Sequence, residues 1–170
     1  PLVVDLDGTL IRSDLLIESF LLLIKLSPLN IFRVFFWLLK GKAYLKSEIA
    51  RHVDIPVEWL PFNLELIEYL KAQKKAGREI ILATASHKRY AHAVAQHLGI
   101  FDDVLATDDS RNLSGTAKRA ALTERYGEKQ YVYAGNAPVD LKVWDHCHQA
   151  IVVADKGLVK QEEKHCPIEK

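Results

Sequence analysis

The sequence predicts an α/β fold, a doubly wound (Rossmann-like) parallel sheet of five strands with a helical cap insert between strands 1 and 2. Short, almost continuously apolar runs alternate with longer amphipathic stretches, which is typical of βαβ units whose sheet is covered on both faces. One long interval, residues 13–60, contains no such run and lies between the first strand and the helix that precedes the second. The predicted strands are Leu2–Leu6, Glu79–Ala83, Asp103–Ala106, Gln130–Ala134 and Gln149–Val153.

Length and composition limit the class of protein. A chain of 170 residues with 49% apolar and 26% charged residues suits one globular domain with a small insert. The 23 basic side chains are balanced by 22 acidic ones, so no excess of positive charge favours nucleic acid as a partner. Cys147 and Cys166 are too few for a disulfide framework and lack metal-ligand spacing, which favours free thiols in a reducing compartment, the cytoplasm. No export signal is expected at the N-terminus.

Helix signals lie between the predicted strands. A helix beginning near Pro61 is expected to bury Leu64, Ile67 and Leu70 and to end before Gly77, after two lysines that suit the negative end of a helix. The other helices of this part are predicted over His87–Leu98, Thr116–Tyr126 and Val139–Trp144.

The insert is predicted to consist of three helices and is unusually apolar. The stretch from Leu15 to Leu39 is interrupted by Glu18, Lys25 and Arg33, so it does not have the pattern of a membrane span. We expect its apolar side chains to pack within the insert and against the core; the alternatives are a hydrophobic substrate pocket or a membrane-surface contact. The predicted helices are Leu15–Leu26, Leu29–Lys40 and Lys42–Val53. The predicted units are a core of residues 1–12 and 61–155, a cap of residues 13–60, and a polar tail or linker of residues 156–170.

Two aspartates, Asp5 and Asp7, follow the first strand in the segment Asp5-Leu6-Asp7-Gly8-Thr9-Leu10. Ligands of open α/β sheets bind at the carboxyl ends of the strands, and the strand period of two places both carboxylates on one side. Carboxylates this close repel each other and therefore require a cation or a shared proton. A hard divalent cation such as Mg²⁺ prefers oxygen ligands of this kind, and Gly8 allows the chain to turn away sharply.

This segment resembles the first motif of the haloacid dehalogenase-like (HAD) hydrolases, most of which are Mg²⁺-dependent phosphatases that form an aspartyl-phosphate. The resemblance implies Asp5 as the nucleophile and Asp7 as the general acid and base, with Thr9 orienting Asp7. It also implies that the backbone carbonyl of Asp7 is a metal ligand. Dehalogenase members lack an acid at the position of Asp7, so this residue favours phosphate chemistry.

Three later segments resemble the remaining motifs of the family. Thr84 matches the residue that hydrogen-bonds the transferring phosphoryl group, and Lys118, which follows Gly115, matches the lysine that neutralises the nucleophile and the phosphate. Asn136 stands where the family most often has an acid, and we expect weaker metal binding because one negative charge is lost. Asp140 is expected to steady a metal-bound water or Lys118.

The residues around Thr84 complete the predicted site. Ala85, Ser86 and His87 are expected to bind substrate together with Thr9. Ser86 is also predicted as the N-cap of the following helix, and the alternative for His87 is a position in the first turn of a surface helix. The predicted ligands of Mg²⁺ are Asp5, Asp7, Asn136 and Asp140.

The resemblance covers residues 2–153 and implies a hydrolase of a small-molecule phosphomonoester. The apolar insert predicts a hydrophobic leaving group, such as that of a lipid or prenyl phosphate. The run Gly135–Trp144 also resembles HAD modules joined to membrane aromatic prenyltransferases. The alternative function is therefore a weakly active or non-catalytic regulatory or docking module of a larger prenyltransferase at the cytoplasmic face of the membrane. It would contact the membrane surface or a fused membrane domain through the apolar cap or the C-terminal tail.

Overall fold

The structure, a computed structural model, describes residues 1–153 and residue 167. The predicted polar tail of residues 156–170 lies outside the described residues except for Pro167, and so does Cys166.

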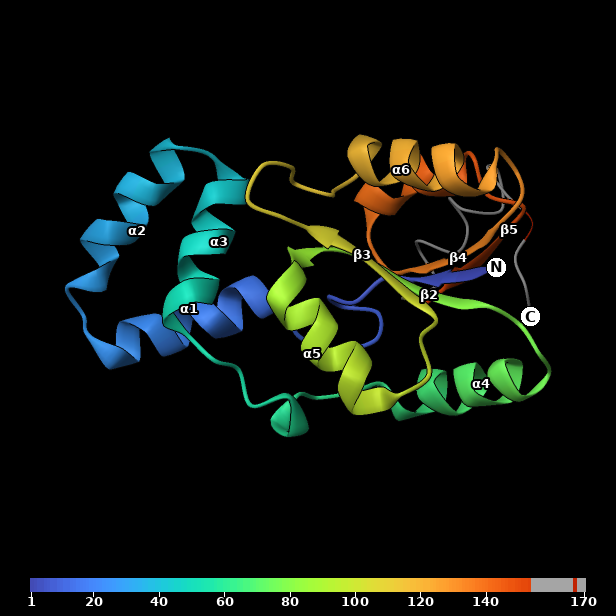
Figure 1. Cartoon of the computed structure of the whole chain (residues 1–170), viewed down its shortest axis with the longest axis horizontal. Helices are drawn as coiled ribbons and strands as arrows, with labels where there is room; N and C mark the ends of the chain where they lie inside the picture. The colour runs from blue at the N-terminus through green and yellow to red at the C-terminus, as the bar shows by residue number, and fades with distance from the viewer. Residues whose placement is uncertain (154–166, 168–170) are drawn as a thin grey trace.

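The sheet has five parallel strands in the order β3-β2-β1-β4-β5 (Figure 1). The central strand β1 pairs on one side with β2, where Leu2 lies opposite Ile80, and on the other side with β4, where Leu2 lies opposite Val132. The predicted five-stranded sheet is confirmed, and the loops after β1, β2 and β4 meet at one edge. The strands are β1 (Leu2–Val4), β2 (Ile80–His87), β3 (Asp103–Thr107), β4 (Val132–Gly135) and β5 (Gln149–Val152).

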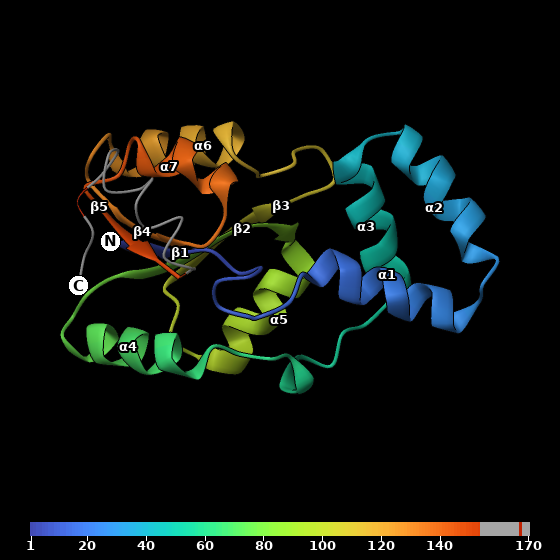
Figure 2. The same ribbon diagram turned by 180° about the vertical axis from the view of Figure 1, so that it is seen from behind.

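Helices cover both faces of the sheet, as a doubly wound fold requires (Figures 1 and 2). Leu2 and Val4 of β1 join the core beneath α4 and α5, whereas Val3 points to the opposite core, which contains the fully buried Trp144 of α7. Because successive side chains of a strand point to opposite faces of the sheet, these three residues contribute to both cores. The helices are α4 (Leu64–Lys75) and α5 (Lys88–Leu98) on one face, and α6 (Thr116–Tyr126) and α7 (Leu141–Trp144), preceded by η2 (Pro138–Asp140), on the other.

The helix predicted to begin near Pro61 begins at Leu64 instead. The side chain of Asn63 accepts a hydrogen bond from the backbone N–H of Leu66 at 3.4 Å and caps the helix, which leaves Pro61 outside it. Leu64, which was expected to be buried, is exposed, whereas Leu66 and Ile67 are buried. The Asn63 side chain gives a partner to one of the backbone N–H groups that have none within the first turn of the helix.

The second strand is longer than predicted. It continues beyond Ala83 to His87, and the N-cap of α5 is His87 rather than Ser86. The His87 Nδ1 accepts a hydrogen bond from the N–H of Arg89 at 3.3 Å. The Ser86 hydroxyl is engaged elsewhere, in the site described below, which is why this residue does not cap the helix.

Residues 13–60 form a helical unit without a strand, placed at one end of the sheet (Figures 1 and 2). We refer to these residues as the cap. Its two connections to the rest of the chain run side by side, since the Arg12 N–H donates to the Pro61 carbonyl at 2.8 Å and the Asn63 N–H donates to that of Leu10 at 2.9 Å. The cap has a small core of its own, made by Leu23, Leu45, Ile49 and Val53. Its elements are α1 (Leu15–Leu26), α2 (Asn30–Leu39), α3 (Lys42–His52) and η1 (Val57–Trp59).

Candidate active site

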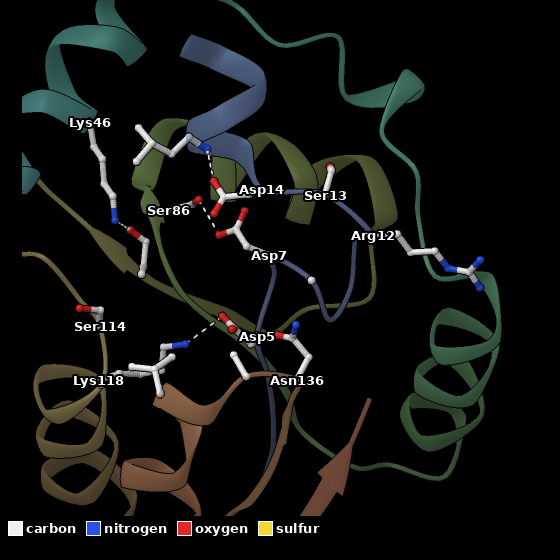
Figure 3. A pocket seen from close by; sticks show the side chains of 16 residues that line it. Asp5, Asp7, Arg12, Ser13, Asp14, Lys46, Ser86, Ser114, Lys118 and Asn136 are labelled. Atoms are coloured by element: carbon white, nitrogen blue, oxygen red, sulfur yellow. Dashed lines mark hydrogen bonds and ion pairs between the residues drawn. The ribbon is translucent and has the colours of Figure 1, made fainter. Parts of the chain in front are cut away.

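A cavity of about 430 Å³ lies at the carboxyl end of β1, between the sheet and the cap (Figure 3). It is lined by the loops after β1 and β4, the end of β2, the start of α6 with the loop before it, and residues from α1 and α3 of the cap. Its lining therefore combines segments that are far apart in the sequence. The charged residues that line it are Asp5, Asp7, Arg12, Asp14, Lys46 and Lys118.

Asp5 and Lys118 form a buried ion pair at this cavity. Lys118 Nζ lies 2.8 Å from Asp5 Oδ1 and also donates a hydrogen bond to the Tyr133 hydroxyl at 2.8 Å. The Tyr133 hydroxyl in turn donates to Asp140 Oδ1 at 2.8 Å, and that oxygen lies 4.0 Å from Lys118 Nζ. The ammonium is therefore held between two carboxylates and a hydroxyl, with Asp5 on the side of the cavity.

Asp140 supports this arrangement from behind the cavity. It is buried, and its Oδ2 accepts hydrogen bonds from the backbone N–H groups of Asn136 at 3.1 Å and Ala137 at 3.0 Å. A Cβ on Gly135 would lie 2.8 Å from the same oxygen, so this close approach requires glycine. Asp140 is not among the residues that line the cavity, so it is placed to hold the loop and Lys118 rather than a metal ion.

Asp7 joins the end of β2 to the first helix of the cap. Its Oδ1 accepts a hydrogen bond from the N–H of Leu15 at 2.8 Å, and its Oδ2 accepts one from the Ser86 hydroxyl at 2.7 Å. The Thr84 hydroxyl lies 3.3 Å from the same oxygen, but Thr84 is fully buried and does not line the cavity, whereas Ser86 does. Of these two hydroxyls only that of Ser86 faces the cavity, two residues beyond the position matched from the sequence.

Thr9 and Asn136 form a second pair. The buried Thr9 hydroxyl donates a hydrogen bond to Asn136 Oδ1 at 3.0 Å, so it orients Asn136 and not Asp7, the partner expected from the sequence. Gly8 has a φ of +75°, and a Cβ there would lie 2.2 Å from Asn136 Nδ2. Glycine is therefore needed at this turn for Asn136 to approach the first motif.

A match to a protein-family model covers most of the chain. Residues 2–144 match the model described as haloacid dehalogenase-like hydrolase. The chain belongs to this family. Its four motif regions are those whose residues meet in Figure 3, at the ends of β1, β2 and β4 and at the start of α6.

Solved structures of HAD proteins and of related folds are similar to this chain. A protein of unknown function from Bordetella pertussis aligns with a TM-score of 0.70 and 15% identity, covering 98% of this chain and 96% of that one. A substrate-bound phosphoserine phosphatase aligns with a TM-score of 0.62 and 15% identity, covering 99% and 92%. At this level of identity the similarity shows the fold.

One sequence relative is much longer than this chain. An uncharacterized protein of Sinorhizobium fredii is 34% identical over 164 residues, which are 96% of this chain and 31% of that protein. The chain therefore spans about a third of the length of this curated relative. The resemblance to prenyltransferase-associated HAD modules is not tested by these matches and stays a prediction.

Burial raises the pKa values of both aspartates in this HAD site. Desolvation raises the pKa of Asp5 from 3.8 to about 6; the Lys118 charge opposes the shift, and the Asp140 charge adds to it. Desolvation also raises the pKa of Asp7, opposed by hydrogen bonds from the Leu15 N–H and the Ser86 hydroxyl. Both carboxyls therefore hold their protons more tightly than they would in water, and a further cation near them would favour ionisation.

The oxygen atoms around the cavity fit Mg²⁺. Among the described residues no group of three or more His, Cys, Asp or Glu side chains could hold a metal ion. The cavity instead offers the carboxylates of Asp5 and Asp7 and the amide oxygen of Asn136. Mg²⁺ retains several waters in proteins and needs only one or two carboxylates beside substrate phosphate, so this all-oxygen set suits it.

Lys46, the residue of α3 that lines the cavity, was not predicted from the sequence. Lys46 Nζ donates hydrogen bonds to the Ala85 carbonyl at 2.6 Å and to Asn112 Oδ1 at 2.9 Å, which ties the cap to the ends of β2 and β3. Desolvation lowers its pKa. No motif marks this residue, because a lysine on a cap helix has the same local pattern as a solvated one. Arg12, Ser13, Asp14 and Ser114 also line the cavity and were missed.

The remaining predicted substrate-binding residues, Ala85 and His87, separate in the structure. Ala85 lines the cavity beside Ser86. His87 is buried and borders a smaller recess beside Tyr90, with its Nε2 lying 3.7 Å from Asp109 Oδ1. It is therefore not among the residues that line the main cavity.

The raised pKa of Asp5 predicts a pH-dependent effect of Asp5→Asn on stability in EDTA. The folded state binds the Asp5 proton more tightly than the unfolded state does. Protonation of Asp5 therefore stabilises the folded chain fully below pH 4, and this stabilisation is lost as pH rises through about 6. The free energy of unfolding of Asp5→Asn minus that of the unchanged chain should therefore increase by up to about 3 kcal/mol between pH 4 and pH 7.

Urea denaturation across this pH range measures the difference, and Glu124→Gln, at an exposed position of α6, is the matched control. Adding Mg²⁺ at pH 7 should reduce this increase in the stability difference, because the cation stabilises the ionised Asp5 carboxylate, which only the unchanged chain has. A pH-independent difference between Asp5→Asn and the unchanged chain would contradict the prediction.

Proposed function

We propose that this chain hydrolyses phosphomonoesters in the cytoplasm, through a phosphorylated Asp5. We propose that Mg²⁺ is bound by Asn136 and by the first motif, which includes Asp5. The observation that carries the proposal is the Asp5 carboxylate at the cavity, with Lys118 Nζ 2.8 Å from one of its oxygens. A fixed ammonium keeps the carboxylate ionised for attack and offsets charge on the phosphoryl oxygens in the transition state.

The chemistry needs two transfers. A carboxylate oxygen of Asp5 attacks phosphorus, an acyl-phosphate forms, and the bond to the leaving oxygen breaks while Asp7 gives that oxygen a proton. Asp7 then takes a proton from water, whose oxygen attacks phosphorus and releases inorganic phosphate and free Asp5. Desolvation raises the pKa of Asp7, so its carboxyl is protonated more readily than one in water, which supports its role as the acid. Bound Mg²⁺ would supply positive charge to the nucleophile and the phosphate.

Two further side chains support binding of the phosphate ester. Ser86 presents a hydroxyl to the cavity, already oriented by Asp7, and we assign it the phosphoryl contact in place of Thr84. Lys46 enters from the cap and presents a cation to the leaving-group side of the cavity. The amide at Asn136 gives the metal site one negative charge fewer than an acid would, which supports weak rather than absent metal binding.

A non-catalytic docking module of a longer membrane-associated prenyltransferase is the second candidate. Two observations favour it: the amide of Asn136 in place of an acid, and the length of the relative, of which this chain spans only about a third. The two candidates differ in whether Asp5 reacts.

Hydrolysis of para-nitrophenyl phosphate separates these candidates. We expect Mg²⁺-dependent turnover that EDTA abolishes, and a fall in kcat of at least about 10³-fold in Asp5→Asn, since loss of a nucleophile has effects of that size or larger. Glu124→Gln, exposed on α6, should retain full activity. Equal, metal-independent rates in the unchanged chain and Asp5→Asn would reject the enzyme and favour the docking module.

The residues that line the cavity favour a different leaving group from the one predicted from the sequence. The apolar cap predicts a hydrophobic leaving group, yet the larger aliphatic side chains that line the cavity are Leu16 and Val139, and the rest of the lining is mostly polar or charged. Large exposed apolar residues of α2, such as Phe35, do not line it. We propose a compact leaving group that carries an anionic or carbonyl oxygen toward Lys46.

Comparison of kcat/KM on a small phosphorylated hydroxy acid and on a prenyl monophosphate tests this choice. We expect the hydroxy-acid phosphate to be preferred at least about tenfold, and the preference to shrink in Lys46→Met because the cation near the leaving group is removed. A tenfold preference for the prenyl phosphate would instead support the hydrophobic leaving group predicted from the sequence.

A further inference from the structure

The outer helix of the cap, α2, exposes most of its apolar side chains. Asn30, Val34 and Trp37, spaced as one face of a helix, turn inward, where Val34 and Trp37 pack on the cap core. The outward apolar side chains of α2 and of its N-cap, Leu29, are 45–71% exposed. We call six of them the α2 apolar face: Leu29, Phe32, Phe35, Phe36, Leu38 and Leu39.

This surface has no role in the site or in the cores of the described chain. None of its residues lines the cavity or belongs to a core cluster, and α2 lies at the outer end of the cap, away from the sheet (Figures 1 and 2). Apolar patches of this kind mark binding surfaces in folded proteins. No helix in the described part of the chain is long and apolar enough to cross a membrane, and α2 has 10 residues. The face therefore suits contact along a surface.

The charges around α2 have one sign. Between Glu18 and Glu48 the sequence contains no acidic residue and five basic ones. Four of these, at both ends of α2 and within it, are exposed: Lys25, Arg33, Lys40 and Lys42. Helices that lie in the plane of a bilayer combine Phe, Trp and Leu on one side with Lys and Arg near the headgroups, and anionic lipids attract such charges.

We propose that the α2 apolar face docks this chain on the surface of an anionic lipid bilayer. Phe32, Phe35 and Phe36 enter the boundary between headgroups and acyl chains, and the four cations pair with lipid phosphate and carboxylate groups. A second copy of the chain fits this surface less well, because two such faces would bring the same cations against each other. The docking surface is separate from the cavity, so it does not depend on the proposed phosphatase activity.

Flotation of the full chain with vesicles tests the proposal. We expect binding to phosphatidylcholine vesicles that contain about one third phosphatidylserine, weaker binding to phosphatidylcholine alone, and release as salt is raised. The double variant Phe32→Ser/Phe36→Ser should lose at least about tenfold in affinity. Leu64→Ser is the matched control, because Leu64 is equally exposed but lies on α4, and it should bind like the unchanged chain.

Three outcomes would overturn the proposal. They are no binding to the anionic vesicles, binding that Phe32→Ser/Phe36→Ser does not weaken, and self-association in lipid-free buffer that this variant abolishes without any vesicle binding. Hydrolysis of para-nitrophenyl phosphate in solution should be the same in all of these variants, since none alters a residue of the cavity. Failure of docking is therefore distinguishable from failure of the phosphatase activity.

Discussion

The contact between the Lys118 ammonium and the Asp5 carboxylate, buried at the tip of the central strand, is the interaction on which the site depends. Burying these two charges is costly, and the cost is offset only because Tyr133 and Asp140 complete a hydrogen-bonded network around the ammonium. The position of β1 in the middle of the sheet makes the network feasible, since β4 brings Tyr133 beside it. Removing Lys118 would leave the carboxylates of Asp5 and Asp140 without the cation between them.

The same edge of the sheet also fixes the cap. Asp7 accepts the N–H of Leu15 at the start of α1, and Lys46 of α3 reaches the carbonyl of Ala85 at the end of β2. Groups that line the cavity thus also hold the cap over it. The cap therefore has two distinct surfaces: a polar one, which includes Lys46, toward the cavity, and an apolar one on α2 that faces outward.

The sequence predicted the sheet, the helices of the cap and the meeting of Asp5 with Lys118, because these follow from apolar periodicity and from motif order. It could not predict which hydroxyl of β2 faces the cavity. Ser86 lies on the part of β2 that continues past the predicted end at Ala83, and its hydroxyl donates to Asp7. Lys46 was missed for a similar reason, since its role arises from the packing of the cap on the sheet and not from its local sequence.

The central claim, that Asp5 is the group that receives the phosphoryl, has a direct measurement. The chain is mixed with a phosphomonoester and Mg²⁺, quenched in acid within a turnover, digested and examined by mass spectrometry. The expected result is one added phosphoryl group on the N-terminal peptide that contains Asp5, absent when Asp5→Asn is treated in the same way. Release of inorganic phosphate with no phosphorylated peptide, or with the phosphoryl group on a different residue, would contradict the claim.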